Sequence, residues 1–222
     1  MTRNDQDMTT RLTDALAAPD ASMRLQAALS AGTHPEPGFV PVLIARNAEE
    51  PDFFVRDMLT WALTRQNPDL TVPRLLAELR SVTPQARSQA LHTLSKIGDR
   101  RAWPALTHAL LHDPDDEVAR AAWRTAVGLA PDEARPELAE TLATQLGRGD
   151  RELQRSLSRA LAELGDTAGP VLRRAAESPD SAVRLHAIAT ERIVRDPEEG
   201  FDTALHEARR LSALRAAPTV GE

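Results

Sequence analysis

Apolar residues along this chain recur with the spacing of amphipathic helices, in pairs of short segments separated by Gly, Asp and Pro. Residues 84–111 show the pattern most clearly. The apolar face of a first helix there carries Ala86, Ala90, Leu91 and Leu94. Gly98 follows, and a glycine can end a helix in the left-handed conformation without a Cβ clash. Pro104 suits the first turn of a second helix, because its missing N–H needs no partner there. The stretch therefore predicts a helical hairpin.

The same hairpin recurs at a nearly constant interval. An apolar residue, here named the anchor, marks each first helix; the anchors are Met23, Val55, Ala86, Val118, Leu153 and Val183. Successive anchors are 32, 31, 32, 35 and 30 residues apart. A Pro follows 18 residues after the first four anchors, at Pro41, Pro73, Pro104 and Pro136. An internal period of this length predicts a stacked array of helical repeats.

Two charged residues accompany most anchors. Three residues before the anchor lies Asp20, Asp52, Asp115, Asp150 or Asp180, with Thr83 as the departure. Directly after the anchor lies Arg24, Arg56, Arg87 or Arg184. The Asp predicts a helix N-cap, because its carboxylate can accept hydrogen bonds from backbone N–H groups of the first turn. We expect the Arg to pair with a carboxylate of the next repeat and to form a ladder of ion pairs.

The order of Asp, anchor, Arg, Ala/Leu run, Gly-Asp and Pro-x-Leu resembles the HEAT repeat family, in the short bacterial form that phycobilisome-lyase-type proteins share. The resemblance covers about residues 19–212. It implies an all-α fold, a right-handed α-solenoid (α-α superhelix) of about six HEAT-like helical hairpins. Strand signals agree with this, since the chain has no Tyr and no Asn-Gly or Asp-Gly hairpin turn.

The period also predicts the domain organisation. One domain is expected over residues 9–215, after a disordered segment 1–8, and residues 9–18 are expected to form an N-terminal cap helix. The expected repeats span about 19–49, 50–81, 82–112, 113–147, 148–178 and 179–214. The tail 216–222 contains Pro and Gly and is expected to be flexible.

Composition narrows the classes of function. The absence of Cys excludes disulfides, thiolate zinc sites and thiol nucleophiles. No apolar run approaches the length of a membrane span, and the N-terminus lacks a hydrophobic signal region, so a cytoplasmic protein with no membrane partner is expected. The net charge is −6, which disfavours a nucleic-acid partner because phosphate backbones attract basic surfaces. We expect a monomer.

The second helix of each hairpin holds the candidate binding residues. Positions one, four, five and eight after the Pro point away from the apolar face on a helical wheel. HEAT-like arrays line their concave side with second helices, so the resemblance places these residues in a groove. The candidate partner-binding residues are Arg46, Glu49, Arg74, Glu78, His108, His112, Glu137, Glu140, Arg174, His206 and Arg209. This mixture of acidic, basic and Ala residues is typical of a protein-binding groove. It is equally typical of a helix face that is exposed to solvent.

Trp61 is the candidate for a contact on the convex side. It falls six residues after its anchor, where sister repeats place Leu29 and His92, on a less buried side of the first helix. Trp123 falls on an apolar face and is expected in the core, and Trp103 is expected to be half-buried.

Two His patterns raise the question of a metal. His108 and His112 lie four apart on one helix, a spacing that can hold a divalent ion, but spacing indicates no third ligand. His206 and Glu207 form a single His-Glu pair, whereas HEAT-like deoxyhypusine hydroxylases need several such pairs to hold iron. We therefore expect no metal and no cofactor.

The sequence predicts a non-catalytic scaffold or adaptor that binds a protein or peptide partner on its concave helices. It shows no Gly-rich phosphate loop, Ser/His/Asp arrangement or nucleophile elbow, so no catalytic residue is assigned. Two enzymatic alternatives stay open. One is a HEAT-like alkylpurine DNA glycosylase, which acidic groove residues such as Glu78 and Glu137 disfavour. The other is a phycobilin-lyase-like enzyme, an alternative supported only by the resemblance of the repeats.

Overall fold

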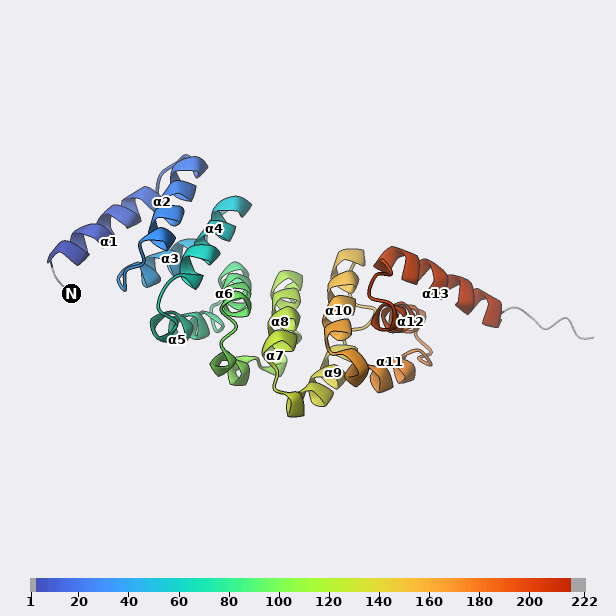
Figure 1. The fold of residues 1–222 in the computed structure, drawn as a ribbon. Helices are drawn as coiled ribbons and strands as arrows, with labels where there is room; N and C mark the ends of the chain where they lie inside the picture. The colour runs from blue at the N-terminus through green and yellow to red at the C-terminus, as the bar shows by residue number, and fades with distance from the viewer. Residues whose placement is uncertain (1–2, 217–222) are drawn as a thin grey trace, which may run out of the picture. The chain divides into compact units, whose positions relative to one another are not determined.

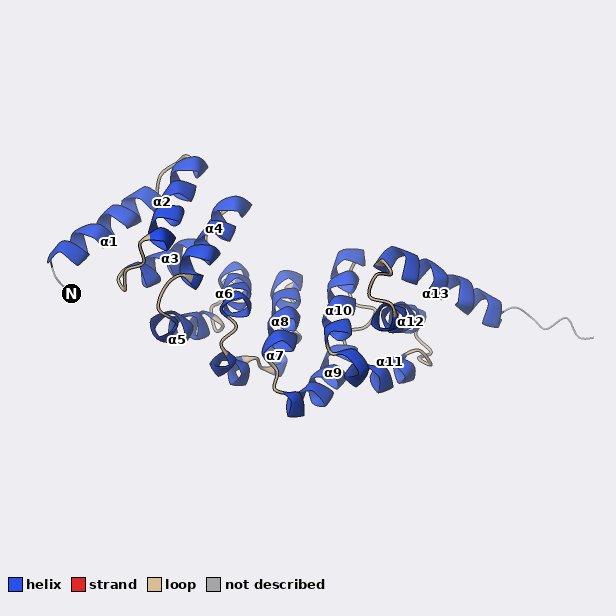
Figure 2. Ribbon diagram, in the orientation of Figure 1, coloured by secondary structure: helices blue, strands red, loops and turns tan. Residues whose placement is uncertain are grey.

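The computed structural model describes residues 3–216, and no strand occurs in that range (Figures 1 and 2). The helices are α1 (Arg3–Leu16), α2 (Ala21–Thr33), α3 (Phe39–Asn47), α4 (Phe53–Thr64), α5 (Pro68–Glu78), α6 (Pro84–Ile97), α7 (His108–Leu111), α8 (Asp116–Leu129), α9 (Arg135–Ala143), α10 (Arg151–Glu163), α11 (Gly169–Ala175), α12 (Ser181–Arg195) and α13 (Phe201–Ala216). Three 3₁₀ turns, η1 (Arg100–Ala105), η2 (Asp132–Ala134) and η3 (Gly165–Ala168), lead into second helices. The predicted all-α fold of helical hairpins is confirmed.

The hairpins group into two compact units. Unit 1 comprises residues 1–107 and 117–129, and unit 2 comprises residues 108–116 and 130–222. In unit 1 the first helices α2, α4 and α6 pack successively against one another, and the second helices α3 and α5 lie side by side, with η1 next to α5 (Figure 1). Helix α1 covers α2 and α3. In unit 2 the first helices α10 and α12 pack together, and α9 contacts both α7 and α11.

Four of the hairpins begin with the Asp N-cap that the sequence predicted. The carboxylates of Asp20, Asp52, Asp150 and Asp180 accept hydrogen bonds from backbone N–H groups in the first turns of α2, α4, α10 and α12. Gly98 ends α6 in the left-handed conformation, with φ 71°. These residues determine where the helices begin and end, because each provides for backbone groups at a helix end that would otherwise lack a hydrogen-bond partner.

The Arg that follows the anchor contacts backbone carbonyl oxygens, and in the first hairpin also the expected carboxylate. Arg24 does reach a carboxylate of the next repeat, that of Glu50, at 2.7 Å. Arg56 Nη1, in contrast, donates to the carbonyl oxygens of Glu50 and Pro51, at 2.9 and 2.7 Å. Arg87 and Arg184 likewise donate to carbonyls of the segment just before their own helix, and Arg24 adds two bonds of this kind. In these four hairpins the guanidinium therefore ties the first helix to the segment that leads into it, because it donates to carbonyl oxygens of that segment.

The second helix of the third hairpin differs from the prediction. Pro104 lies inside the 3₁₀ turn η1 rather than in the first turn of an α-helix, and only the four residues of α7 follow in α-helical form. Asp99 caps the N–H of Arg101, so helical turns start well before the Pro. Pro104 then has no N–H to donate within that turn, and the chain leaves helical geometry at Leu106 (ψ 77°).

The chain ends also differ in part. Helix α1 begins at Arg3, so the segment expected to be disordered is helical from residue 3, while residues 1–2 lie outside the described range. Met8 extends the apolar stripe of Leu12 and Leu16, which is why the helix starts before Thr9. Of the tail expected to be flexible, Ala216 belongs to α13, and residues 217–222 lie outside the described range.

Helix α13 does not take the place of a second helix. Its apolar residues Phe201, Ala204, Leu205 and Ala208 pack on α12 and against Ala162 of α10. Asp202 of α13 forms an ion pair with Arg155 of α10 at 2.9 Å. The row of second helices in unit 2 is therefore formed by α7, α9 and α11.

Burial along the first helices follows the predicted apolar face. Val55, Val118 and Trp123 are buried, and Trp103 is half-buried as expected. Met23, the anchor of the first hairpin, is 59% exposed, because the one helix before it in the chain, α1, leaves it uncovered. Within the described residues, no helix is long and apolar enough to cross a membrane.

Helices α2 and α4 approach each other closely at Gly32. A Cβ added to Gly32 would lie 2.2 Å from Cζ3 of Trp61 and 2.9 Å from Cα of Ala62. The indole of Trp61 therefore rests on a position that only glycine can occupy, and 38% of this residue remains exposed. The exposed part agrees with its predicted place on the less buried side of the helix.

Replacing Gly32 by Ala is expected to lower the free energy of unfolding by about 1–3 kcal/mol, because the new methyl group must push α2 and α4 apart. Gly128→Ala in α8 is the matched control, since a Cβ there meets nothing within 4 Å. The control should be neutral or stabilising by up to about 1 kcal/mol. Urea denaturation of the three proteins checks this, and equal effects of the two substitutions would contradict the packing described.

Candidate functional site

The predicted residues of unit 1 lie on α3 and α5 with different surroundings. Glu49 and Arg74 are exposed, as a groove residue should be. Arg46 is not free, because its guanidinium bonds Glu50 at 2.6 Å and only 19% of its side chain is exposed. The predicted role of Arg46 as an open partner contact is therefore corrected: it helps to neutralise a buried carboxylate.

That carboxylate belongs to Glu50, which is fully buried. Arg24 contacts both of its oxygens, Arg46 contacts one, and the N–H of Asp52 donates to Oε1 at 2.9 Å. Burial raises the pKa of the Glu50 carboxyl, but the hydrogen bonds from Arg24, Asp52 and Arg46 outweigh it and lower the pKa to about 2. The network joins the first two hairpins and fixes the end of α3.

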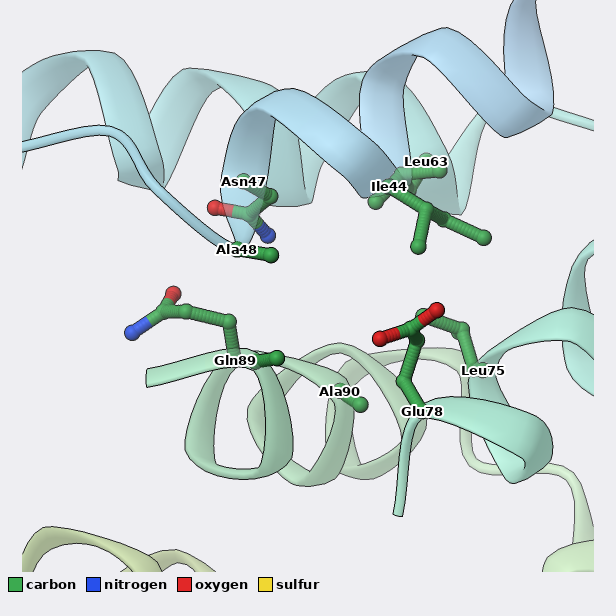
Figure 3. A pocket seen from close by; sticks show the side chains of 9 residues that line it. Ile44, Asn47, Ala48, Leu63, Leu75, Glu78, Gln89 and Ala90 are labelled. Carbon is green, nitrogen blue, oxygen red and sulfur yellow. The ribbon is translucent and has the colours of Figure 1, made fainter. Parts of the chain in front are cut away.

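A small pocket opens beside this network, between α3, α4, α5 and α6. Its apolar lining consists of Ile44, Ala48, Leu63, Leu75, Ala86 and Ala90. Asn47, Glu78 and Gln89 provide its polar groups, and Figure 3 shows the Glu78 carboxylate turned into the space between the helices. The space, including its opening to solvent, amounts to about 190 Å³. Glu78, one of the candidate partner-binding residues, therefore lines a small pocket.

Asn47 was not singled out from the sequence, although it is one of the residues that line this pocket. It is 2% exposed, and its Nδ2 lies 3.5 Å from Oγ1 of Thr60. Its Oδ1 is buried without a hydrogen-bond partner among the described residues. A polar residue at the C-terminal end of α3 gives no sequence signal of this, because helix ends usually face solvent.

In unit 2, residues at equivalent positions of successive second helices meet. Glu140 on α9 forms an ion pair with Arg174 on α11. His112, at the end of α7, places Nε2 2.8 Å from Oγ1 of Thr144, directly after α9. Both pairs join equivalent positions of successive second helices. His112 is half-buried, and the other three residues are exposed. Glu137, the remaining candidate on α9, is also exposed.

The His108–His112 pair is occupied by protein contacts. The two rings stack with centroids 3.8 Å apart, and Nδ1 of His112 donates to the carbonyl oxygen of His108 at 3.0 Å. With Nε2 on Thr144, both ring nitrogens of His112 are engaged. Over the described residues, no group of three or more His, Cys, Asp or Glu side chains could hold a metal ion.

His206 and Arg209 are exposed on α13. Because α13 packs on α12 and reaches α10, these two residues do not continue the row that ends with Arg174 on α11. The sequence assigned them to the groove by extending the repeat period into the last hairpin. The burial of Leu205 and the Asp202–Arg155 ion pair show that α13 follows a different packing.

A buried polar cluster that the sequence did not reveal ties α10 to α12. His186 Nδ1 accepts the N–H of Gly147 at 3.0 Å, so the ring proton sits on Nε2, 3.0 Å from the carbonyl oxygen of Gln154. Nε2 also lies 3.0 Å from Oγ of Ser158, which in turn contacts Oγ1 of Thr190 at 2.7 Å. Ser158 is fully buried, so this His–Ser contact faces the core and serves packing.

The geometry defines a helical-repeat protein, and comparison with known proteins gives the kind of repeat. The sequence profile of HEAT repeats matches residues 51–128 and 72–148. Residues 51–148 therefore consist of HEAT repeats, which confirms the resemblance found in the sequence. No curated protein matches the chain.

The solved structures that are similar to the chain include the following three. An engineered protein is 22% identical, with a TM-score of 0.46, over 85% of this chain and 96% of its own. The complex of CpcE and CpcF of phycocyanin lyase from Nostoc sp. PCC7120 is 19% identical, with a TM-score of 0.48, over 96% of this chain and 90% of its own. Human deoxyhypusine hydroxylase in complex with glycerol is 17% identical, with a TM-score of 0.47, over 95% of this chain and 98% of its own.

Because His186 is buried, we expect the free energy of unfolding to depend on pH. Burial lowers its pKa from 6.5 to about 4, so between these values the unfolded chain binds more protons than the folded chain. The free energy of unfolding is therefore expected to fall as the pH drops through this window, by up to about 3 kcal/mol. Urea denaturation between pH 7.5 and pH 4.5 measures the slope. His186→Gln should flatten it relative to wild type, whereas a variant of the exposed His206, His206→Gln, should keep it. A slope unchanged by His186→Gln would contradict the assignment.

Proposed function

We propose that this protein is a non-catalytic scaffold that binds a protein or peptide partner along its second helices. The observation that carries the proposal is the register of α7, α9 and α11. Side chains at equivalent positions lie next to one another from helix to helix, as the Glu140–Arg174 and His112–Thr144 contacts demonstrate. A partner segment that crosses these helices meets a continuous row of polar side chains.

The energetics of this row favour a binding surface over a structural one. Glu140 and Arg174 are 54% and 64% exposed, and an ion pair this exposed contributes only about 0–1 kcal/mol to folding. Their charges can therefore be redirected to a partner at small cost. The mixture of Arg, Glu, His and Thr offers donors and acceptors to peptide groups, and HEAT repeats over residues 51–148 support the same reading.

Affinity capture with the full chain as bait tests the proposal. The wild type and two charge-matched double variants are incubated with native lysate of the source organism. Glu140→Ala/Arg174→Ala alters the row on α9 and α11, and Arg159→Ala/Glu163→Ala alters exposed residues of the first helix α10. A protein captured by the wild type should be retained by the α10 variant and lost from the α9/α11 variant.

Two results would contradict the proposal. One is that wild type captures nothing beyond an empty matrix, and the other is that both double variants retain the same protein equally. Thermal denaturation of both variants is the check on folding, and their midpoints are expected to match the wild type within a few degrees because all four side chains are exposed.

A further inference from the structure

The exposed face of α4 carries a row of apolar side chains, here called the stripe. Its members are Phe54, Met58 and Trp61, which follow one another at intervals of four and three residues and so lie within about 60° on the helical wheel. Phe54 is 70% exposed, Trp61 is 38% exposed and Met58 is half-buried. One side of a first helix is therefore apolar where it meets solvent.

Neighbouring residues widen the stripe at both ends. Phe53 is exposed and meets the Phe54 ring edge-on, with the two centroids 5.6 Å apart. The Trp61 indole rests on Gly32 of α2, and Leu29, one turn before Gly32, is also exposed. Of the four Phe and three Trp residues in the chain, three therefore lie on the exposed side of this one helix.

An exposed aromatic cluster of this kind is typical of a binding surface. Aromatic side chains offer a large apolar area with few rotatable bonds, and they are enriched among the residues that contribute most to binding. The repeat itself does not require an apolar residue at the position of Phe54, because Ser22 and Gln85 take that position in the hairpins on either side.

Three cations adjoin the stripe and are here called the cationic rim: Arg65, Lys96 and Arg124. Arg65 lies one turn after Trp61, Lys96 takes the equivalent position on α6, and Arg124 on α8 takes the position of Trp61. Arg124 Nη2 lies 3.3 Å from Nδ1 of His92 on α6, so equivalent positions of successive first helices are neighbours. Within the described residues, none of the three cations forms an ion pair with a carboxylate.

The C-terminal halves of these three helices, all in unit 1, also lack acidic residues. Residues 58–66, 90–98 and 121–129 contain no Asp or Glu. Burial, together with the charges of Arg124 and Lys96, lowers the pKa of His92 to about 4, although Asp57 acts in the opposite direction. Asp57 is the one carboxylate within α4, and it lies in the first half of the helix. The surface beside the stripe is therefore locally positive in an acidic chain.

We propose that the stripe and the cationic rim together bind an acidic amphipathic helix of a partner protein. The apolar residues of that helix pack on the stripe, and its carboxylates pair with the rim. This surface lies on first helices of unit 1, apart from the second helices of the proposed function, so the inference does not depend on that proposal.

The form and charge of the surface select this partner. A stripe along two turns of a helix fits another helix, whose apolar residues recur at the same spacing of three and four residues. The rim attracts carboxylates that come into contact with it, whereas the net charge of −6 acts at longer range and is screened by salt. Three cations are fewer than the roughly four to eight that recruit a protein to an anionic membrane.

A designed peptide, acetyl-Ala-Glu-Glu-Leu-Leu-Ala-Ala-Leu-Glu-Glu-Leu-Leu-Ala-Ala-amide, is the probe for this surface. It is titrated to about 1 mM into the full-length ¹⁵N-labelled protein, a range that detects micromolar dissociation constants. The expected result is a saturable shift of the indole N–H signal of Trp61, with no shift for the buried Trp123. The peptide with Lys in place of Glu should bind about tenfold more weakly, and a scrambled order without the leucine stripe should not bind.

Two pairs of variants locate the contact. Phe54→Ala should weaken binding of the acidic peptide by about tenfold or more, whereas Met23→Ala, which removes an exposed apolar side chain of α2 outside the stripe, should leave it unchanged. Arg124→Gln should weaken binding several-fold and reduce its dependence on salt, whereas Arg159→Gln at the equivalent position of α10 should do neither. All four side chains are exposed, so the melting temperatures should stay close to that of the wild type.

The inference is overturned if the Trp61 signal does not shift, if the acidic and lysine peptides bind equally, or if Phe54→Ala and Met23→Ala behave alike. It is also overturned if the Trp61 signal responds to phosphatidylglycerol vesicles and not to the peptide, or if it responds only to the concentration of the protein itself, which would make a membrane or a second copy the occupant. None of these results bears on the lysate capture, which tests α9 and α11.

Discussion

Within each unit, the structure depends on the packing of successive first helices against one another. A single helical hairpin of this size cannot bury enough apolar surface to offset the entropy of ordering its residues, so its stability comes from the adjacent hairpins. Leu59 and Leu63 on α4 are fully buried in this way, between α2 and α6. Buried polar bonds add direction to the packing: Gln66 Nε2 donates to the Ala31 carbonyl, and Thr125 Oγ1 donates to that of Leu91.

This constraint divides the side chains into two sets. The first helices and the entry segments are committed to holding the array together, through the Asp N-caps, the Arg contacts to loop carbonyls and the Glu50 network. The exposed faces of the second helices do not take part in this packing. Charged side chains such as Glu78, Glu140 and Arg174 can vary there without cost to the fold, which is where a helical-repeat protein can carry its specificity.

The sequence predicted the elements that local chemistry determines. Helix periodicity, the Asp caps and the left-handed Gly98 each depend on residues close in the chain, and each is present. It did not predict the hydrogen bonds from the anchor Arg residues to backbone carbonyls, because every residue carries a carbonyl oxygen and the sequence does not show which one lies within reach. It also could not predict the different packing of α13, since the last helix has no following repeat to impose the period.

The candidate site was predictable in part for the same reason. A helical wheel gives the direction of each position on α5 and α9: Glu140 is exposed and Glu78 is half-buried. Arg46 was misplaced because a wheel assigns direction but does not show the buried Glu50 within its reach. Asn47 and the His186 cluster were missed because their burial comes from residues more than ten positions away in the chain, on neighbouring repeats.

Native-state hydrogen exchange of a Leu59→Ala variant tests the central claim most directly. The substitution removes a fully buried side chain from α4 and should cost about 2 kcal/mol or more. If neighbouring hairpins stabilise one another, backbone amides of α2 and α6 should lose protection together with those of α4. Loss of protection confined to α4, with wild-type exchange in both neighbours, would contradict the account.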